Sequence, residues 1–243
     1  MIKRVILVLL LLIPTSLFAQ QGPFLNVMES MMKPENFSTS LSVLLSMGAI
    51  GFVPIFLLTT TSFLRLVIVL SMLRQAIGTQ QAPPNMVIVA LAMFLTVFVM
   101  TPTFDEVRQT AIVPYQKGNV SQMEMLDMAT KPFKYFMLKY TREKDLALFL
   151  EFSQVQYTQD YNNVPIFVLI PAFIISELKT AFQVGFLLFI PFIVIDLIVS
   201  NILLSLGMFM LSPAMISLPF KILLFVLTDG WNLIIQGLLT SYR

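Results

Sequence analysis

The fold class is decided by residues 164–206, which read VPIFVLIPAFIISELKTAFQVGFLLFIPFIVIDLIVSNILLSL. The stretch holds only three charges, two of them at Glu177 and Lys179, among aliphatic and aromatic side chains. A run this apolar favours a membrane over water. Because the charges and two prolines interrupt it, we predict two apolar segments, Val164–Ser176 and Ala181–Leu206, of which the first is too short to span a bilayer.

The rest of the chain has the same apolar character. Hydrophobic residues make up 57% of the 243 residues and charged residues 12%, and the mean hydropathy is +0.86. An average soluble protein has about 25% charged residues, so this composition indicates an integral membrane protein. We predict an all-α, polytopic membrane protein that is built of kinked helical hairpins and carries a small polar helical subdomain.

The composition also excludes several kinds of chemistry. The chain has no cysteine and no histidine, which excludes disulfides, thiolate and imidazole metal sites, Cys and His nucleophiles and a Ser-His-Asp triad. It has no P-loop motif, and its net charge of +2 is too small and too scattered to favour nucleic acid. We therefore expect no enzyme activity, no catalytic residue, no cofactor, no metal and no nucleic-acid partner.

The N-terminus has the pattern of a secretory signal peptide over residues 1–19. Positive charges precede a short apolar run, and cleavage would fall between Ala19 and Gln20. An uncleaved N-terminal anchor is the alternative. Residues 20–40 are polar and irregular, and we expect an exposed leader there.

Residues 41–101 are predicted to form a first hydrophobic helical hairpin. Its two apolar runs are Leu41–Leu73 and Met86–Met100, joined by a polar turn. The first run is longer than a simple span, so we expect Pro54 to kink or divide it. The second run is expected to stop at Thr101–Pro102.

Residues 102–163 differ in containing more than half of the acidic residues of the chain. We predict a small helical subdomain outside the hydrocarbon, on the periplasmic side if the signal peptide is cleaved. Ser121 and Glu124 have the spacing of a capping box, and Pro132 suits a first helical turn. Residues 142–152 alternate charged and apolar side chains at helical spacing.

Residues 164–243 form the predicted second hydrophobic hairpin region, with a bend at residues 207–213. Turns at a membrane boundary are usually polar, yet this one contains Met208, Phe209 and Met210. One interpretation is a buried loop or a lipid contact. The other is a flexible seal, because unbranched thioether side chains can repack around different shapes.

Six charged side chains lie in the largely apolar stretches 41–73 and 164–242, where each is costly in hydrocarbon. They are Arg65, Glu177, Lys179, Asp196, Lys221 and Asp229. Static pairing between helices or subunits and a proton or ion relay are both open, and the near balance of acids and bases favours pairing. Glu177 and Lys179 lie on different sides of a helix, so we expect Lys221 to pair with Glu177. Ala181 and Gly185 form a small-xxx-small pair that suits close helix packing.

Five segments of this sequence closely resemble the signature of the FliP family, a core component of the flagellar type III protein export gate. They are PAFIISELKTAFQVGF (171–186), PFIVIDL (191–197) leading to the Met-rich bend, TSFLR (61–65), GTQQAPPN (78–85), and LPFK (218–221) with DGW (229–231). The resemblance covers about residues 41–240.

The resemblance implies a non-enzymatic protein of the bacterial inner membrane and the flagellar basal body. It would self-associate in a ring, a pentamer by likeness to the family, together with FliQ and FliR, and FlhB and FlhA would join that core. Unfolded flagellar proteins would pass through the assembly.

The resemblance also implies roles for particular residues. Met208, Phe209 and Met210 would form the gasket of a pore loop, although family members often carry three methionines and two prolines there. Glu177 and Lys221 would belong to a belt of charge pairs between neighbouring subunits. The alternatives are a close relative in a virulence type III secretion apparatus, an ion-coupled membrane transporter, and a scaffold whose partners line the channel.

Overall fold

The computed structural model describes residues 48, 51, 54–79, 81–153 and 164–242. The chain divides into two compact units, residues 1–54 and 55–243. The account below concerns the second unit. The predicted signal peptide and exposed leader, with Ala19 and Gln20, lie outside the described residues.

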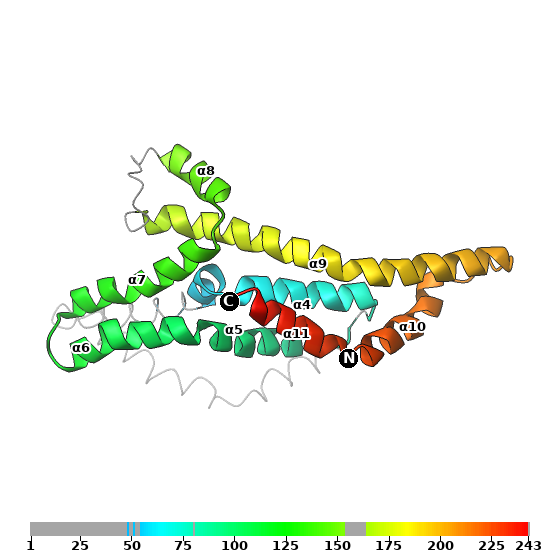
Figure 1. Cartoon of the computed structure of the whole chain (residues 1–243), viewed down its shortest axis with the longest axis horizontal. Coiled ribbons are helices and arrows are strands. Elements are labelled where there is room, and N and C mark those ends of the chain that lie inside the picture. The colour runs from blue at the N-terminus through cyan, green and yellow to red at the C-terminus, as the bar shows by residue number, and fades with distance from the viewer. Residues whose placement is uncertain (1–47, 49–50, 52–53, 80, 154–163, 243) are drawn as a thin grey trace, which may run out of the picture. The chain divides into compact units, whose positions relative to one another are not determined.

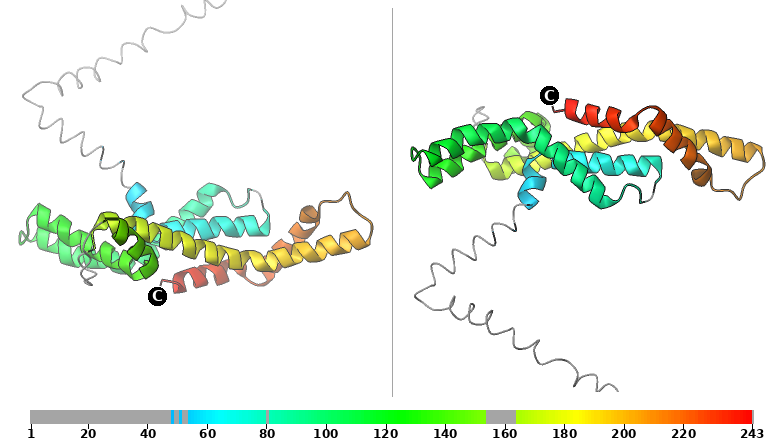
Figure 2. Two further views of the ribbon diagram at one scale, coloured as in Figure 1. Left: turned by 90° about the horizontal axis from the view of Figure 1, so that it is seen from above. Right: turned by 90° about the horizontal axis from the view of Figure 1, so that it is seen from below.

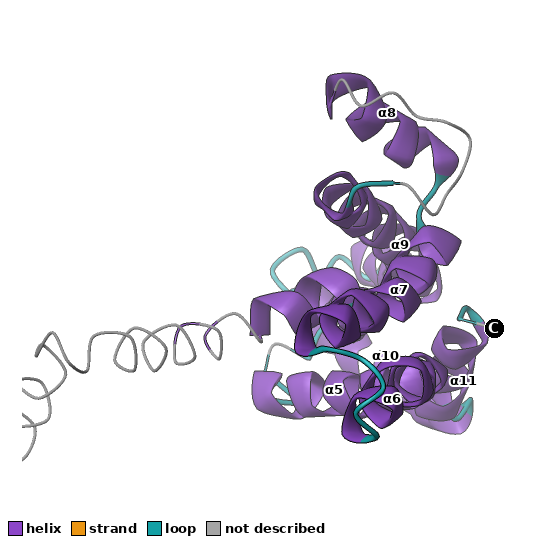
Figure 3. Ribbon diagram, turned by 90° about the vertical axis from the view of Figure 1, so that its left-hand side faces the viewer, coloured by secondary structure: helices purple, strands orange, loops and turns teal. Residues whose placement is uncertain are grey.

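The described part of this unit is built of helices joined by turns, with no strand within it (Figures 1 and 3). The elements are α4 (Phe63–Ile77), α5 (Asn85–Val107), the π-helical turn η3 (Arg108–Ile112), α6 (Val113–Gln116), α7 (Gln122–Tyr140), α8 (Glu143–Ser153), α9 (Ile166–Ser205), α10 (Pro213–Leu227) and α11 (Gly230–Thr240). The all-α prediction is confirmed.

Two continuous helices are long and apolar enough to cross a membrane. They are Asn85–Gln116, which joins α5, η3 and α6, and α9. Two bent pairs reach the same criterion only when each pair is taken as one span. The helix Pro54–Thr60 meets α4 at 83°, and α10 meets α11 at 63°. The described residues therefore hold between two and four membrane spans, as expected for kinked hairpins.

Helix α9 corrects the prediction of two apolar segments in this region. It runs without interruption for 40 residues, through two prolines and through Glu177 and Lys179, a length of about 60 Å. The charged residues do not end the helix because each has a partner on another element, as described below. A charged side chain within a membrane span usually pairs with another group, which lowers its cost in hydrocarbon.

Two prolines also lie elsewhere than expected. Pro102 does not end the second apolar run, since α5 continues through it to Val107. Pro132 lies inside α7 rather than in its first turn. The capping box at the start of α7 is confirmed, with Glu124 N donating to Ser121 Oγ at 3.3 Å and Ser121 N donating to Glu124 Oε2 at 2.7 Å.

The break in the first apolar run that the structure describes falls at Thr61–Ser62, between Thr60 and the start of α4. The hydroxyl of Thr60 donates to the carbonyl of Phe56 at 2.7 Å, which satisfies this side chain at the end of its own helix. The residues just before Pro54 lie outside the described part, so the expected kink at that proline stays a prediction.

The core of the unit is the lengthwise packing of α4 on the first half of α9 (Figure 2). Leu66 and Val69 of α4 are fully buried, as are Leu169 and Phe173 of α9. The side chains of α7 and α8 extend the same apolar cluster. One face of this half of α9 is therefore buried, whereas Phe167 and Phe182 on its other side are exposed.

The second half of α9 and most of α10 are different, because large apolar side chains there are exposed. Leu197, Ile198 and Ile202 of α9 and Leu223 and Val226 of α10 are more than one third exposed. An apolar surface this extensive needs lipid or another protein to cover it. The unit therefore has a packed half, around α4 and the first half of α9, and a bare half, which is the second half of α9 with α10 and has exposed apolar side chains.

Candidate functional site

A fully buried ion pair joins α4 to α9. Arg65 Nε donates to Glu177 Oε2 at 2.9 Å, and Arg65 Nη2 donates to Glu177 Oε1. The side chain of Arg65 is 4% exposed and that of Glu177 is 0% exposed. This fork-to-carboxylate geometry uses the rigid guanidinium to satisfy both carboxylate oxygens.

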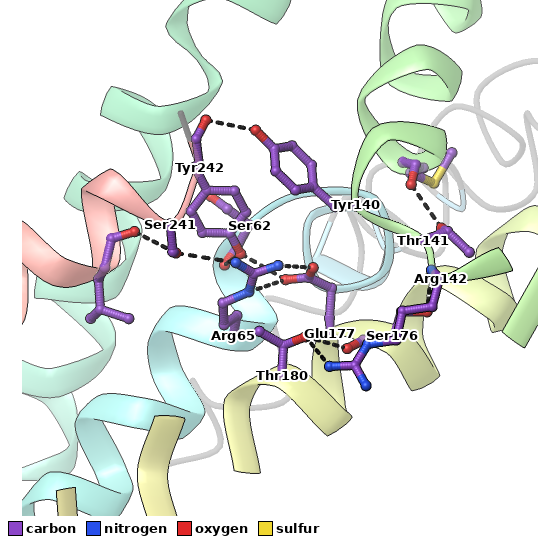
Figure 4. A network of polar contacts seen from close by, with 12 residues as sticks. Ser62, Arg65, Tyr140, Thr141, Arg142, Ser176, Glu177, Thr180, Ser241 and Tyr242 are labelled. Atoms are coloured by element: carbon purple, nitrogen blue, oxygen red, sulfur yellow. Dashed lines mark hydrogen bonds and ion pairs between the residues drawn. The ribbon is translucent and has the colours of Figure 1, made fainter. Parts of the chain in front are cut away.

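The last described residues of the chain complete this pair (Figure 4). The hydroxyl of Tyr242 donates to Glu177 Oε2 at 2.7 Å, and its ring lies 4.1 Å from Arg65 Cζ. Arg65 Nη1 donates to Ser241 Oγ at 3.1 Å, and the hydroxyl of Tyr140 donates to the backbone carbonyl of Tyr242 at 2.6 Å. The cluster thus ties α4, α7, α9 and the end of α11 together.

A second ion pair, between Lys179 of α9 and Asp145 of α8, holds these two helices together. Lys179 lies two residues after Glu177 in α9. Ser176 Oγ donates to Asp145 Oδ2 at 2.9 Å and accepts the backbone amide of Arg142 at 3.0 Å. Burial raises the pKa of the Asp145 carboxyl, but the hydrogen bonds from Lys179 and Ser176 and the neighbouring positive charges outweigh it and leave this pKa below its ordinary value of 3.8.

A third ion pair links α9 to α10 near the bare half of the unit. Lys221 Nζ donates to Asp196 Oδ2 at 2.6 Å and to the carbonyl of Ala76 at 3.4 Å. Ser217 Oγ donates to the other carboxylate oxygen at 2.5 Å. The Lys221 side chain is buried, whereas that of Asp196 is 37% exposed.

Glu177 and Lys221 do not pair with each other within one chain, and their expected pairing between neighbouring subunits stays a prediction. Glu177 pairs with Arg65 and Lys221 pairs with Asp196, so the two residues expected to pair with each other have different partners in the same chain. Within this chain Glu177 is enclosed and bonded at both carboxylate oxygens. The inference that Glu177 and Lys179 need separate partners is confirmed.

Asp229 lies at the bend between α10 and α11, outside the helices that it separates. It adopts the left-handed conformation with φ of 49°, which is uncommon for a residue with a side chain. Its carboxylate accepts a hydrogen bond from the Asn232 side-chain amide at 3.1 Å. The next residue, Gly230, must be small because a Cβ there would lie 2.3 Å from the Phe225 ring.

The Met-rich bend is an exposed loop between α9 and α10. Gly207 turns the chain with φ of 73°. Met208, Phe209 and Met210 are 47%, 77% and 101% exposed. Within the described residues nothing covers Met210, so the contact that would bury this loop, with lipid or with another protein, lies outside them.

The small-xxx-small pair lies at the contact between α4 and α9. Ala181 is fully buried, and a Cβ on Gly185 would lie 2.3 Å from Met72 Sδ. No group of three or more side chains that could hold a metal ion occurs among the described residues.

The comparison with known proteins identifies the family. Residues 44–238 match the FliP family. The chain belongs to the FliP family. It is 48% identical over 219 residues to the flagellar biosynthetic protein FliP of Bacillus subtilis (strain 168), covering 90% of this chain and 99% of that protein.

Other relatives are similar at nearly the same level. The FliP of Aquifex aeolicus (strain VF5) is 47% identical over 210 residues, covering 86% of this chain and 88% of that protein. The FliP of Pectobacterium carotovorum subsp. carotovorum is 47% identical over 208 residues, covering 86% and 81%. FliP is a flagellar export component and not an enzyme, so this chain is a membrane protein of flagellar biosynthesis.

Sequence reasoning missed several partners in this FliP-family site. Asp145 lies in a polar segment, and Tyr140, Ser241 and Tyr242 lie at helix ends, where no apolar period marks them as buried. One feature of the sequence did point to such a partner. Arg65 is the only charge in its apolar run, so it needs a carboxylate on another helix.

We predict that removing one charge of the buried pair is far more damaging than removing both. Glu177→Leu leaves the Arg65 guanidinium buried without a counter-charge and should lower the free energy of unfolding by about 3–5 kcal/mol. The double variant Arg65→Leu/Glu177→Leu should recover much of this loss. Detergent-solubilised chains can be compared by reversible unfolding, with the exposed pair Asp127 and Lys131 as the matched control, for which Asp127→Leu should cost less than about 1 kcal/mol. Equal losses for Glu177→Leu and Asp127→Leu would contradict the prediction.

We also predict that the docking of α8 on α9 depends on pH. Because the folded pKa of Asp145 lies below its unfolded value, this carboxylate stabilises docking above about pH 4 and loses that effect as the pH falls further. Hydrogen exchange of α8 amides, corrected for the intrinsic pH dependence, should stay constant from about pH 7 to 5 and rise below about 4. Asp145→Asn should remove this acid-dependent rise, and Glu143→Gln, which changes an exposed carboxylate of the same helix, should keep it. An unchanged profile in Asp145→Asn would assign the rise to other groups.

Proposed function

We propose that the chain is the core pore-forming subunit of the flagellar type III protein export gate. In this proposal several copies form a ring, expected to be a pentamer, with FliQ and FliR in the inner membrane at the basal body of the flagellum. FlhB and FlhA type proteins join that core. Unfolded flagellar proteins cross the membrane through the centre of the assembly.

The observation that carries the proposal is the exposed apolar loop between α9 and α10. Loops facing water are normally polar, and three consecutive large apolar side chains here would be unfavourable in water. A ring of such loops, one from each copy, would instead bury them against one another. Methionine suits this position because its flexible side chain can fit around substrates of different shape.

The ion pairs support the proposal because they fix the helices, whereas the loop between α9 and α10 has no such bond. Three ion pairs hold the charges of the apolar helices α4, α9 and α10 within this chain: Arg65 with Glu177, Lys179 with Asp145, and Asp196 with Lys221. The remaining charge of α4, Arg74, donates to the carbonyl of Pro83 at 3.2 Å. A fixed hairpin with an adaptable tip is the arrangement that a reversible seal requires.

The names of the relatives favour the flagellar branch. Eight relatives at 43–48% identity share the name flagellar biosynthetic protein FliP. A role in a virulence secretion apparatus is therefore the less favoured alternative. In a scaffold role, in which partner subunits line the channel, the Met208–Met210 loop would be only a packing contact between subunits.

Ion-coupled transport is the second candidate, because the Asp196 carboxylate is partly exposed in a spanning helix. Its bonds to Lys221 and Ser217 fit a static pair better than a proton relay. Asp196→Asn should therefore leave motility at the parental level as long as the complex assembles. Loss of proton-dependent export in an assembled Asp196→Asn complex would favour the transporter.

We predict that a polar loop opens the closed gate. Replacing Met208, Phe209 and Met210 by serines keeps the loop length but removes the apolar contacts, so small solutes should enter cells that carry the assembled complex. The measurement is dye uptake normalised to the amount of complex. Met123→Ser, which changes an exposed methionine of α7, is the control and should not leak. An assembled triple-serine complex without leakage would overturn the sealing role.

A further inference from the structure

The bend between the helix Pro54–Thr60 and α4 falls in a run of hydroxyl residues, TTTS at positions 59–62. The hydroxyl of each threonine donates to the backbone carbonyl four residues earlier. The three bonds are Thr59 to Ile55 at 2.8 Å, Thr60 to Phe56 at 2.7 Å and Thr61 to Leu57 at 2.5 Å. Such bonds compete with the backbone amides and often bend a helix, so this run favours the observed angle of 83°.

The next residue, Ser62, does not continue this series of bonds. In an unbroken helix its hydroxyl would donate to the carbonyl of Leu58, as the threonine hydroxyls do to theirs. In the bent form the Ser62 hydroxyl is fully buried and has no hydrogen-bond partner within the described part of the chain. A buried hydroxyl without a partner is costly. Ser62 therefore opposes the bend in which it lies.

Helix α7 holds both arms of the bend in place. On the short arm, the ring of Phe56 packs edge to face on Phe133 of α7, with the ring centroids 5.3 Å apart. The other arm, α4, is reached through Tyr242. The ring of Tyr242 stacks on Phe136 of α7 at a centroid distance of 6.2 Å and lies 4.1 Å from the guanidinium carbon of Arg65 in the first turn of α4. Tyr242 therefore links α7 to α4 next to the break.

Tyr242 is also held at both of its polar ends (Figure 4). Its hydroxyl donates to Glu177 at 2.7 Å and lies 3.5 Å from the carbonyl oxygen of Ser62. Its own carbonyl accepts the Tyr140 hydroxyl at 2.6 Å. The residue that follows α11 is thus fixed against the break itself, and its removal would release α4 from α7 at this point.

A bent and a straight form of this segment differ in the length of continuous helix. Helix α4 has 15 residues and is about 22 Å long, which is less than the roughly 30 Å of hydrocarbon in a bilayer. A straight helix over Pro54–Ile77 would be about 36 Å long. Straightening would therefore join two arms that are each too short to span into one helix that is long enough.

We infer that residues 59–62 are a conformational switch between a bent and a straight helix, and that docking of Tyr242 between α7 and α4 selects the bent form. Ser62 favours the straight form, because only there does its hydroxyl find an acceptor. Tyr242 favours the bent form, because it joins both arms through α7. When two states are balanced in this way, a local change shifts the population between them.

Spin labels at two introduced cysteines measure the switch in the full chain, which has no cysteine of its own. Ile55→Cys lies on the short arm and Tyr135→Cys on α7, and both positions are exposed. The parent should give one short distance. Turning an arm about 10 Å long through 83° moves its far end by about 13 Å, so Tyr242→Ala should add a second, longer distance. Tyr115→Ala, at an exposed tyrosine of α6, is the control and should keep the single distance.

Ser62→Ala separates a switch from a loosened arm. Added to Tyr242→Ala, it removes the hydroxyl that favours the straight form, so the ratio of long to short distances should fall about 3–10-fold, as for one hydrogen bond. Tyr242→Phe keeps the ring but loses the bond to Glu177, and should give a smaller long-distance population even if Tyr242→Ala loses helical content by circular dichroism. A single short distance in the folded Tyr242 variants would overturn the inference. A longer distance that Ser62→Ala leaves unchanged would overturn it too, because the arm would then be loose and not straight.

Discussion

The arrangement of the described unit depends on the buried ion pair between Arg65 and Glu177. An unpaired charge in this position would be strongly destabilising, so α4 and α9 must meet in the one register that brings the guanidinium and the carboxylate together. Tyr242 then bonds the same carboxylate and stacks on the same guanidinium. One constraint therefore fixes two helices and the end of the chain.

This constraint also explains why α9 remains one helix of 40 residues. Its first half carries Glu177 and Lys179, which are bonded to α4 and α8. Its second half has the single pair of Asp196 with Lys221, beyond which the helix is bare and apolar as far as the loop of Met208–Met210. The ion pairs hold α9 and α10 in place on the rest of the unit. The apolar end of this hairpin, at the loop of Met208–Met210, is left for other molecules to cover.

Much of the fold could be predicted from the sequence, because composition and the helical spacing of apolar residues depend only on local chemistry. The helical class, the capping box at Ser121 and the helix after Arg142 follow from such patterns. The partners of the buried charges could not be predicted, since pairing Arg65 with Glu177 requires the three-dimensional register of two helices. The continuity of α9 was missed for the same reason: Glu177 looks like an interruption until its partner is known. Pro102 was misjudged because a proline ends a helix only where the neighbouring structure does not compensate for its missing amide.

The most direct test of the pore proposal uses the absence of cysteine from the chain. A single cysteine is placed at Met208, and an export substrate that carries one cysteine is stalled in the assembled gate. The account predicts a disulfide cross-link between the two, formed only when the substrate is stalled. Cysteines at Met208 that link only to other copies of the chain, with the substrate still trapped, would place the loop in a packing contact and contradict the account.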